Sequence, residues 1–149
     1  MAKHFIKPPF NKLHQVFKSE DGYITNSEWA VKTEFIESYP SNILPMNGPL
    51  EEKALPRGEG VLISPTIHLC EDLRRSGVLF RKFATEDGSK KVWVNEDYYR
   101  MFLRYGLPIC WTFYYENRPL VARTSDDRLI GIISPVGLSE KYRTLGVDC

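Results

Sequence analysis

The stretch that decides the fold is Lys91–Val136, which reads KVWVNEDYYRMFLRYGLPICWTFYYENRPLVARTSDDRLIGIISPV. A short apolar run ends at Asn95, whose side chain can accept hydrogen bonds from the free N–H groups of a first helical turn. The two acids that follow complement the positive end of a helix dipole, and Gly106 supplies a left-handed cap. The stretch therefore predicts a helix over 96–105.

Strands are predicted on both sides of this helix. Three runs of β-branched and aromatic residues follow it, at Ile109–Glu116, Pro119–Arg123 and Arg128–Val136, and short polar turns separate them. Such a pattern is typical of an antiparallel meander. Before the helix, Val78–Ala84 and Ser89–Val94 flank an Asp-Gly pair, which indicates a hairpin.

Two further helices and one strand are expected elsewhere. Apolar residues at helical spacing after Pro8-Pro9 predict a helix over Phe10–Lys18. A cap-like Ser64-Pro65 pair predicts another over Thr66–Ser76. Alternation of apolar and polar residues predicts a half-buried strand over Glu28–Ile36.

These elements predict an α+β fold with two or three short helices and antiparallel sheets. The length of 149 residues suits one domain, 1–149. Proline, glycine and scattered charges predict a long surface loop over 37–59, which is either a recognition element or a plain connector. The few apolar residues of 137–149 predict a loosely docked tail.

Composition bounds the possible partners. Charged residues make up 26% and hydrophobic ones 42% of the chain, as in ordinary soluble proteins, and the net charge is only +1. This excludes binding of nucleic acid by overwhelming basic charge but allows a local basic face. No run approaches the ~18–20 apolar residues that a membrane span needs. Three widely spaced cysteines suit a reduced chain, so we expect no membrane association and a cytoplasmic location.

No catalytic, metal or cofactor motif is recognisable. The three histidines lie far apart, Cys70 and Cys110 sit in apolar runs typical of structural thiols, and the glycines stand singly rather than in a phosphate-binding loop. Adjacent acids, such as Asp126-Asp127, are typical of solvated turns. We therefore expect a protein that is not an enzyme and needs no cofactor.

Two residue sets are candidate binding sites. Lys12 and Lys18 lie on the outward side of one predicted helix, and Arg100 and Arg104 on that of the other. They could meet phosphates if the two helices lie side by side, or they could be ordinary solvated faces. The alternative is an aromatic pocket for a small, nucleotide-like ligand, formed by Trp93, Tyr99 and Trp111.

Three segments resemble a known family. They are GYITNSEWAVKT at Gly22–Thr33, KKVWVNEDYYRMFLRYG at Lys90–Gly106 and RPLVARTSDDRLIGIISPVGL at Arg118–Leu138. Their order and motifs are similar to domains of bacterial and phage DNA polymerase sliding clamps. Domains of that family close on an apolar strand with a proline-containing end, like Ile132–Val136.

The resemblance implies a sliding-clamp-like single domain whose helices Phe10–Lys18 and Glu96–Tyr105 face DNA, with Arg100 and Arg104 toward phosphate. Clamp chains carry several such domains, whereas this one has room for one and would form a homo-oligomer through sheet edges.

The expected function is that of a non-enzymatic, phage-type accessory protein that binds DNA or a replication or host-defence protein. A small-ligand binding or sequestering module is the alternative, and an enzyme of unknown type comes third.

Overall fold

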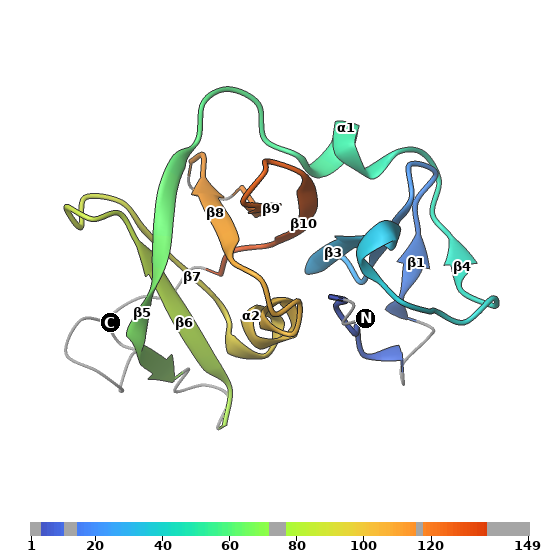
Figure 1. The fold of residues 1–149 in the computed structure, drawn as a ribbon, viewed down its shortest axis with the longest axis horizontal. Coiled ribbons are helices and arrows are strands. Elements are labelled where there is room, and N and C mark those ends of the chain that lie inside the picture. Colours follow the sequence, from blue (N-terminus) through green and yellow to red (C-terminus); the bar gives the residue numbers. More distant parts are fainter. Residues whose placement is uncertain (1–3, 11–14, 72–76, 116–117, 137–149) are drawn as a thin grey trace.

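The computed structural model of the chain describes residues 4–10, 15–71, 77–115 and 118–136. Strands dominate this part of the chain (Figure 1). The strands are β1 Phe17–Lys18, β2 Tyr23–Thr25, β3 Trp29–Lys32, β4 Leu44–Pro45, β5 Val61–Glu71, β6 Leu79–Ala84, β7 Lys91–Asn95, β8 Ile109–Phe113, β9 Leu120–Thr124 and β10 Leu129–Ile133. The helical segments are the 3₁₀ turn η2 Thr33–Phe35, α1 Leu50–Ala54 and α2 Glu96–Leu103.

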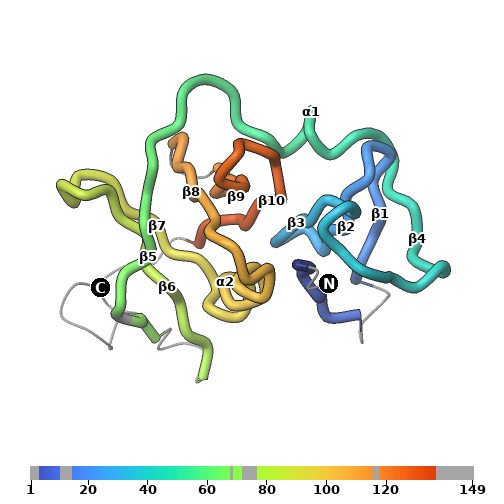
Figure 2. Tube along the Cα trace, viewed as in Figure 1, coloured from blue at the N-terminus to red at the C-terminus, as the bar shows by residue number. Residues whose placement is uncertain are grey.

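The ten strands form one connected sheet in the order β4-β1-β2-β3-β10-β9-β8-β5-β6-β7. All neighbours are antiparallel except β1 and β4, which are parallel. The long strand β5 runs between β8 and β6 (Figure 2), and pairs first with β8 and then with β6. Its register with β6 shifts between Pro65 and Leu69. Because β5 changes partner along its length, the sheet bends around α2. A bridge between Trp93 and Val136 links β7 to the chain that follows β10.

The predicted order of helix and meander is confirmed. The Asn95 side chain accepts a hydrogen bond of 2.8 Å from the Asp97 N–H, as a helix cap does. The helix ends at Leu103, two residues earlier than expected, and Gly106 adopts the left-handed φ of 79°. Strands β8, β9 and β10 pair in sequence, and β6 and β7 form the expected hairpin.

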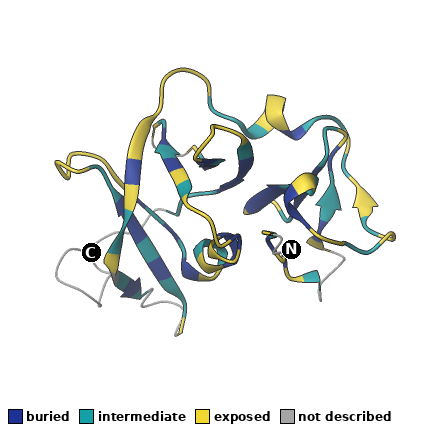
Figure 3. Cartoon of the chain, viewed as in Figure 1, coloured by how far each residue is buried: buried dark blue, intermediate teal, exposed yellow. Residues whose placement is uncertain are grey.

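The core lies where α2 meets the bent sheet (Figure 3). Phe102 of α2 is fully buried and packs against Trp111 of β8 in an edge-to-face arrangement, with ring centroids 5.5 Å apart. Strand β10 pairs with its neighbour β3 in the sheet, with Gly131 opposite Val31. A Cβ atom on Gly131 would lie 2.1 Å from the Ala30 carbonyl oxygen, so only glycine fits at this position.

The α+β prediction is wrong, because the fold is a large, mostly antiparallel sheet with two α-helices in the described residues. Phe17 and Lys18 form β1, so the helix predicted over Phe10–Lys18 does not reach its expected end. Residues 66–71 belong to β5 instead of a helix. Residues 11–14 of the first predicted helix and 72–76 of the second lie outside the described part.

A proline explains the second error. Pro65 was interpreted as a first helical residue, but it lies in β5 opposite Phe83, next to the register shift. Proline is tolerated at such an irregular position of a strand, where its missing N–H breaks no regular ladder. Cys70 then pairs with Phe80 and is fully buried. Leu69 and Cys70, two of the apolar residues that suggested a helical face, therefore lie on a strand, where their side chains point to opposite faces.

Two other expectations need correction. The strand expected over Glu28–Ile36 ends at Lys32, and the next three residues form η2. It is not half-buried, because Trp29, Ala30 and Val31 are all at most 1% exposed. Strand β3 is covered on both faces, since Trp29 and Val31 join one apolar cluster and Ala30 joins another.

The predicted loop 37–59 is mostly exposed, but it contains β4 and α1 and is tied to the sheet. The Asp21 carboxylate accepts hydrogen bonds of 2.9 Å from the N–H groups of Leu50 and Glu51. Leu50 itself is buried in the cluster under α1. The loop is therefore anchored at its middle. The predicted tail, 137–149, lies outside the described residues.

Candidate functional site

Helix α2 turns a cationic side toward solvent. Arg100 and Arg104 are one helical turn apart, and both are exposed. The Arg100 side chain keeps 68% of its surface accessible. The apolar residues Met101 and Phe102 occupy the inner side of the same turn, so packing fixes the direction in which the two guanidinium groups point.

A cleft of about 610 Å³ lies between this side of α2 and the segment 7–9. Its lining residues come from these two segments and are Lys7, Pro8, Pro9, Asp97, Tyr98, Arg100, Met101 and Arg104. Three of them carry positive charge and one carries negative charge. The cleft is therefore a concave site with an excess of positive charge.

The wall opposite α2 is held in place by contacts just before Lys7. The N–H of Ile6 donates to the Phe35 carbonyl at 2.8 Å, and the Ile6 side chain is fully buried. His4 Nδ1 lies 3.1 Å from the carbonyl oxygen of Tyr105, immediately after α2. The segment is thus attached to the core on one side and to the end of α2 on the other.

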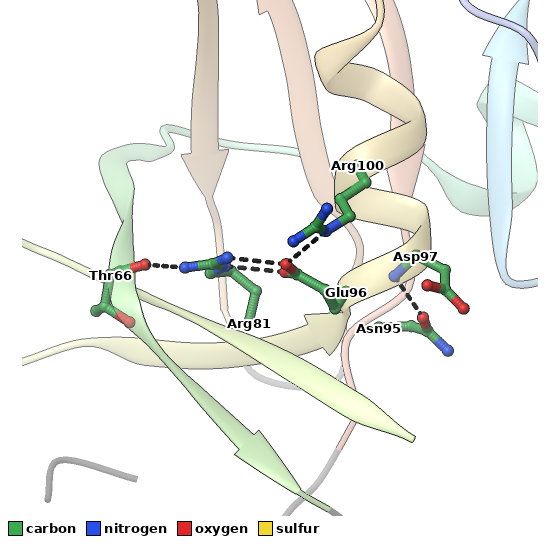
Figure 4. A network of polar contacts seen from close by, with 6 residues as sticks. All are labelled: Thr66, Arg81, Asn95, Glu96, Asp97 and Arg100. Atoms are coloured by element: carbon green, nitrogen blue, oxygen red, sulfur yellow. Dashed lines mark hydrogen bonds and ion pairs between the residues drawn. The ribbon is translucent and has the colours of Figure 1, made fainter. Parts of the chain in front are cut away.

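A buried carboxylate at the start of α2 organises the arginines (Figure 4). Glu96 has a side chain only 5% exposed, and Arg81 of β6 donates to both of its oxygens at 2.9 and 2.8 Å. The hydrogen bond to Glu96 is the main cause that raises the pKa of Arg81, against the opposing effect of burial. Arg81 also donates to the Thr66 carbonyl and so connects α2 with β5.

Arg100 makes a second, outer contact with the same carboxylate. Its Nε donates to Glu96 Oε2 at 3.0 Å. Since Arg81 already neutralises Glu96, this bond orients Arg100 without cancelling its charge. The two terminal nitrogens of Arg100 have no partner within the described residues, and Arg100 is one of the residues that line the cleft.

The other two cations of the cleft differ from Arg100, because they have no ion-pair partner among the described residues. Lys7 and Arg104 are exposed and form no hydrogen bond or ion pair with any residue that the structure describes. Tyr98 provides part of the wall, and its hydroxyl donates to Glu28 at 2.9 Å. Burial, followed by this hydrogen bond, raises the pKa of Tyr98, so its hydroxyl stays protonated near neutral pH. The arrangement suits binding of an anion by charge and by guanidinium hydrogen bonds.

The structure brings together half of the predicted basic set. Arg100 and Arg104 share the cleft, whereas Lys18 lies on β1 and donates to the Tyr39 hydroxyl at 3.0 Å. Lys12 lies outside the described residues. Sequence patterns did not identify Lys7, because a single lysine before Pro8-Pro9 belongs to no periodic pattern. The signal that could have found it is the apolar Ile6 just before it, which is buried and so attaches this segment to the core.

The predicted aromatic set is not brought together. Tyr99 and Trp111 pack with Phe83 inside the main core, with ring centroids 5.2 to 6.1 Å apart. Trp93 lies on the other face of β7, in a separate cluster with Phe80. None of the three predicted residues lines the cleft at α2.

The next features concern metal binding and the two cysteines of the described residues. They contain no group of three or more histidine, cysteine or acidic side chains placed to hold a metal ion. Cys70 is buried and disulfide-bonded, so the expectation of a fully reduced set of cysteines is wrong for this residue. Cys110 is free and exposed, not buried as expected.

None of the helices in the described part of the chain has the length and apolar character needed to cross a membrane. Comparison of the sequence with protein-family models, and of the chain with curated proteins and solved structures, returned no significant match.

Proposed function

We propose that this chain is a non-enzymatic binding protein that associates with DNA through the cleft between α2 and segment 7–9. The observation that supports this most directly is the set of three cations that line the cleft, Lys7, Arg100 and Arg104. Lys7 and Arg104 have no counter-ion among the described residues, and Arg100 shares the Glu96 carboxylate with Arg81. Phosphate groups are the partners that such a set recognises by charge alone.

The proposal is limited to a short contact. The sliding-clamp resemblance implied two helices facing DNA, but β1 replaces the end of the first, so we no longer propose a clamp-like fold. With three cations per chain, affinity for DNA is modest, and a homo-oligomer or a DNA-bound replication or host-defence protein would add to it. We propose an accessory role on this basis, and the disulfide at Cys70 removes the argument from reduced cysteines for a cytoplasmic location.

The test is the salt dependence of binding to a short DNA duplex, measured by fluorescence anisotropy. Three phosphate contacts predict a slope of about −2.7 in a plot of log K against log salt, or about 40-fold weaker binding at 200 mM than at 50 mM salt. Arg100→Glu/Arg104→Glu should abolish most of this binding. Arg57→Glu is the matched control, because Arg57 is exposed on the loop and does not line the cleft. Equal loss in Arg57→Glu and the double variant contradicts the proposal.

A small phosphorylated ligand is the second candidate for the same cleft. The volume of about 610 Å³ is within the range of small-molecule sites, and Met101 and Pro8 give it apolar walls. A nucleotide or pyrophosphate that binds the native state raises the melting temperature, because it stabilises that state by mass action. Such a rise in the wild type, absent in Arg104→Glu and without DNA binding, favours this candidate.

A further inference from the structure

A second concave surface lies at the beginning of β5 and shares no residue with the cleft at α2. It is a groove of about 730 Å³. One wall is formed by residues 60–62 of the strand and the other by the β6–β7 turn; the lining residues are Gly60, Val61, Leu62, Thr85, Glu86, Asp87, Ser89 and Lys90.

The groove lies where the first residues of β5 have no neighbouring strand on one side in the described part of the chain. Val61–Ile63 pair with β8 on one side, whereas pairing with β6 on the other side begins only at Ser64. Beyond this point the β6–β7 turn diverges from β5 (Figure 1). Backbone groups of successive residues in a strand point alternately to the two sides. At least one residue of Val61–Ile63 therefore presents its N–H and C=O to the groove, and no described residue pairs with them there.

The strand also presents apolar side chains at this place. Leu62 is 70% and Val61 42% exposed, so this wall of the groove offers apolar surface to a partner. Gly60 fixes the path of the chain into the strand, because a Cβ at this position would lie 2.0 Å from Thr112 Cγ2. The open part of the edge, Val61–Ile63, belongs to a paired strand of the sheet, and an added strand of about three residues, or roughly 10 Å, matches its length.

The opposite wall is preformed and acidic. The turn is closed by a hydrogen bond of 2.9 Å from the Thr85 N–H to the Lys90 carbonyl. Asp87 accepts further bonds from Thr85 and Ser89, which hold its pKa down at about 2 and keep it charged. Glu86 is exposed beside it, and Glu59 lies just before the strand. The lining of the groove itself carries two acids, Glu86 and Asp87, and one base, Lys90.

We propose that this groove binds an extended, basic segment of a partner protein, which adds as a strand to the open edge of β5 at Val61–Ile63. The unpaired backbone of β5 supplies the hydrogen bonds, Leu62 contacts an apolar side chain of the segment, and Glu86 and Asp87 attract its lysines or arginines. The negative charge of Glu86 and Asp87 repels the phosphates of nucleic acid. The same acids also oppose a second copy of this chain, because pairing β5 with its own symmetry mate brings two acidic rims together.

The experiment uses the full chain and two synthetic peptides of seven residues, Ac-KVKVKVK-NH₂ and Ac-EVEVEVE-NH₂. Binding is followed by NMR titration and by amide hydrogen exchange of residues 60–63. We expect the lysine peptide to protect at least one of these amides and the glutamate peptide to protect none. A lysine peptide methylated on alternate backbone nitrogens should lose binding, since it can no longer pair with the edge.

Leu62→Lys and Glu86→Lys should each weaken binding of the lysine peptide at least fivefold. Ile67→Lys is the matched control, because Ile67 is 89% exposed on the same strand but outside the groove. Circular dichroism checks that the variants are folded. The proposal is overturned if neither peptide protects the edge at millimolar concentration, if both bind equally, or if methylation has no effect. A concentration-dependent dimer that protects the same amides also overturns it.

Discussion

Replacing Glu96 by glutamine removes the charge that Arg81 faces inside the protein and leaves the guanidinium group almost buried. The side chains of Glu96 and Arg81 are only 5% and 15% exposed, and two hydrogen bonds join them. Breaking a buried pair by removing one partner costs about 3 kcal/mol, because the remaining charge has lost both its counter-ion and its hydration. For a chain of this length the melting temperature should fall by roughly 6–12 °C.

The exposed contact between Arg100 and the Glu96 carboxylate provides a control for this prediction. Arg100 contacts Glu96 from outside at 3.0 Å, but its side chain is 68% exposed. An exposed pair four residues apart on a helix contributes only about 0.5 kcal/mol, so Arg100→Gln should hardly change stability. The double variant Arg81→Met/Glu96→Leu should be more stable than Glu96→Gln, since it leaves no buried charge unpaired.

Urea unfolding followed by circular dichroism measures these differences at constant pH and salt. Because the cost depends on burial, Glu96→Gln should destabilise the protein more than Arg100→Gln does. If Glu96→Gln costs less than about 1 kcal/mol, or if Arg100→Gln costs as much as Glu96→Gln, the carboxylate is solvated and this account of α2 is refuted.

Three further predictions concern the sheet and the loop. Gly131→Ala should destabilise the protein by about 1–3 kcal/mol in thermal unfolding, because its Cβ meets the Ala30 carbonyl at 2.1 Å; an unchanged melting temperature would show that β3 and β10 are not so close. Tyr23→Phe should be neutral or stabilising by up to about 1 kcal/mol, since the buried Tyr23 hydroxyl has no hydrogen-bond partner in the described residues; a clear loss in calorimetry would reveal one. Burial opposes ionisation of Asp21, but hydrogen bonds from Ser19, Leu50 and Glu51 outweigh this effect and lower the pKa of Asp21. The contribution of ionised Asp21 to the free energy of unfolding is therefore present above about pH 4 and is lost at more acid pH. Asp21→Asn should therefore flatten the stability profile below about pH 4 and cost about 1 kcal/mol at pH 7, and an unaltered profile would contradict the anchoring of α1.

The parts of the fold that sequence predicted well are those fixed by local chemistry. The cap at Asn95, the left-handed Gly106 and the hairpin signal at 85–88 each act over a few residues, and the structure confirms all three. The two predicted α-helices that failed were inferred from proline start signals together with apolar spacing. Over six to nine residues this spacing does not separate a helix from a strand, and sheet partners decide the outcome. Residues 66–71 became a strand because β6 lies beside them.

The candidate site was half predictable for a similar reason. Arg100 and Arg104 are neighbours through helical geometry, which the sequence contains. Lys7 reaches the same cleft only because Ile6 is anchored to Phe35, a contact between distant segments that no local pattern encodes. The aromatic pocket failed because alternation along β7 places Trp93 and its neighbours Val92 and Val94 on opposite faces.

Arg100 ties the stability of α2 to its proposed function. Its Nε is held by Glu96, and Glu96 is held by Arg81, so the position of the guanidinium group in the cleft depends on a pair that faces the core. A group oriented in this way loses less conformational entropy when it binds phosphate than a freely rotating side chain would. Loss of Glu96 should therefore weaken both folding and anion binding, whereas loss of Arg100 should weaken binding alone. This difference separates an arginine that is positioned for a partner from one that merely covers the start of a helix.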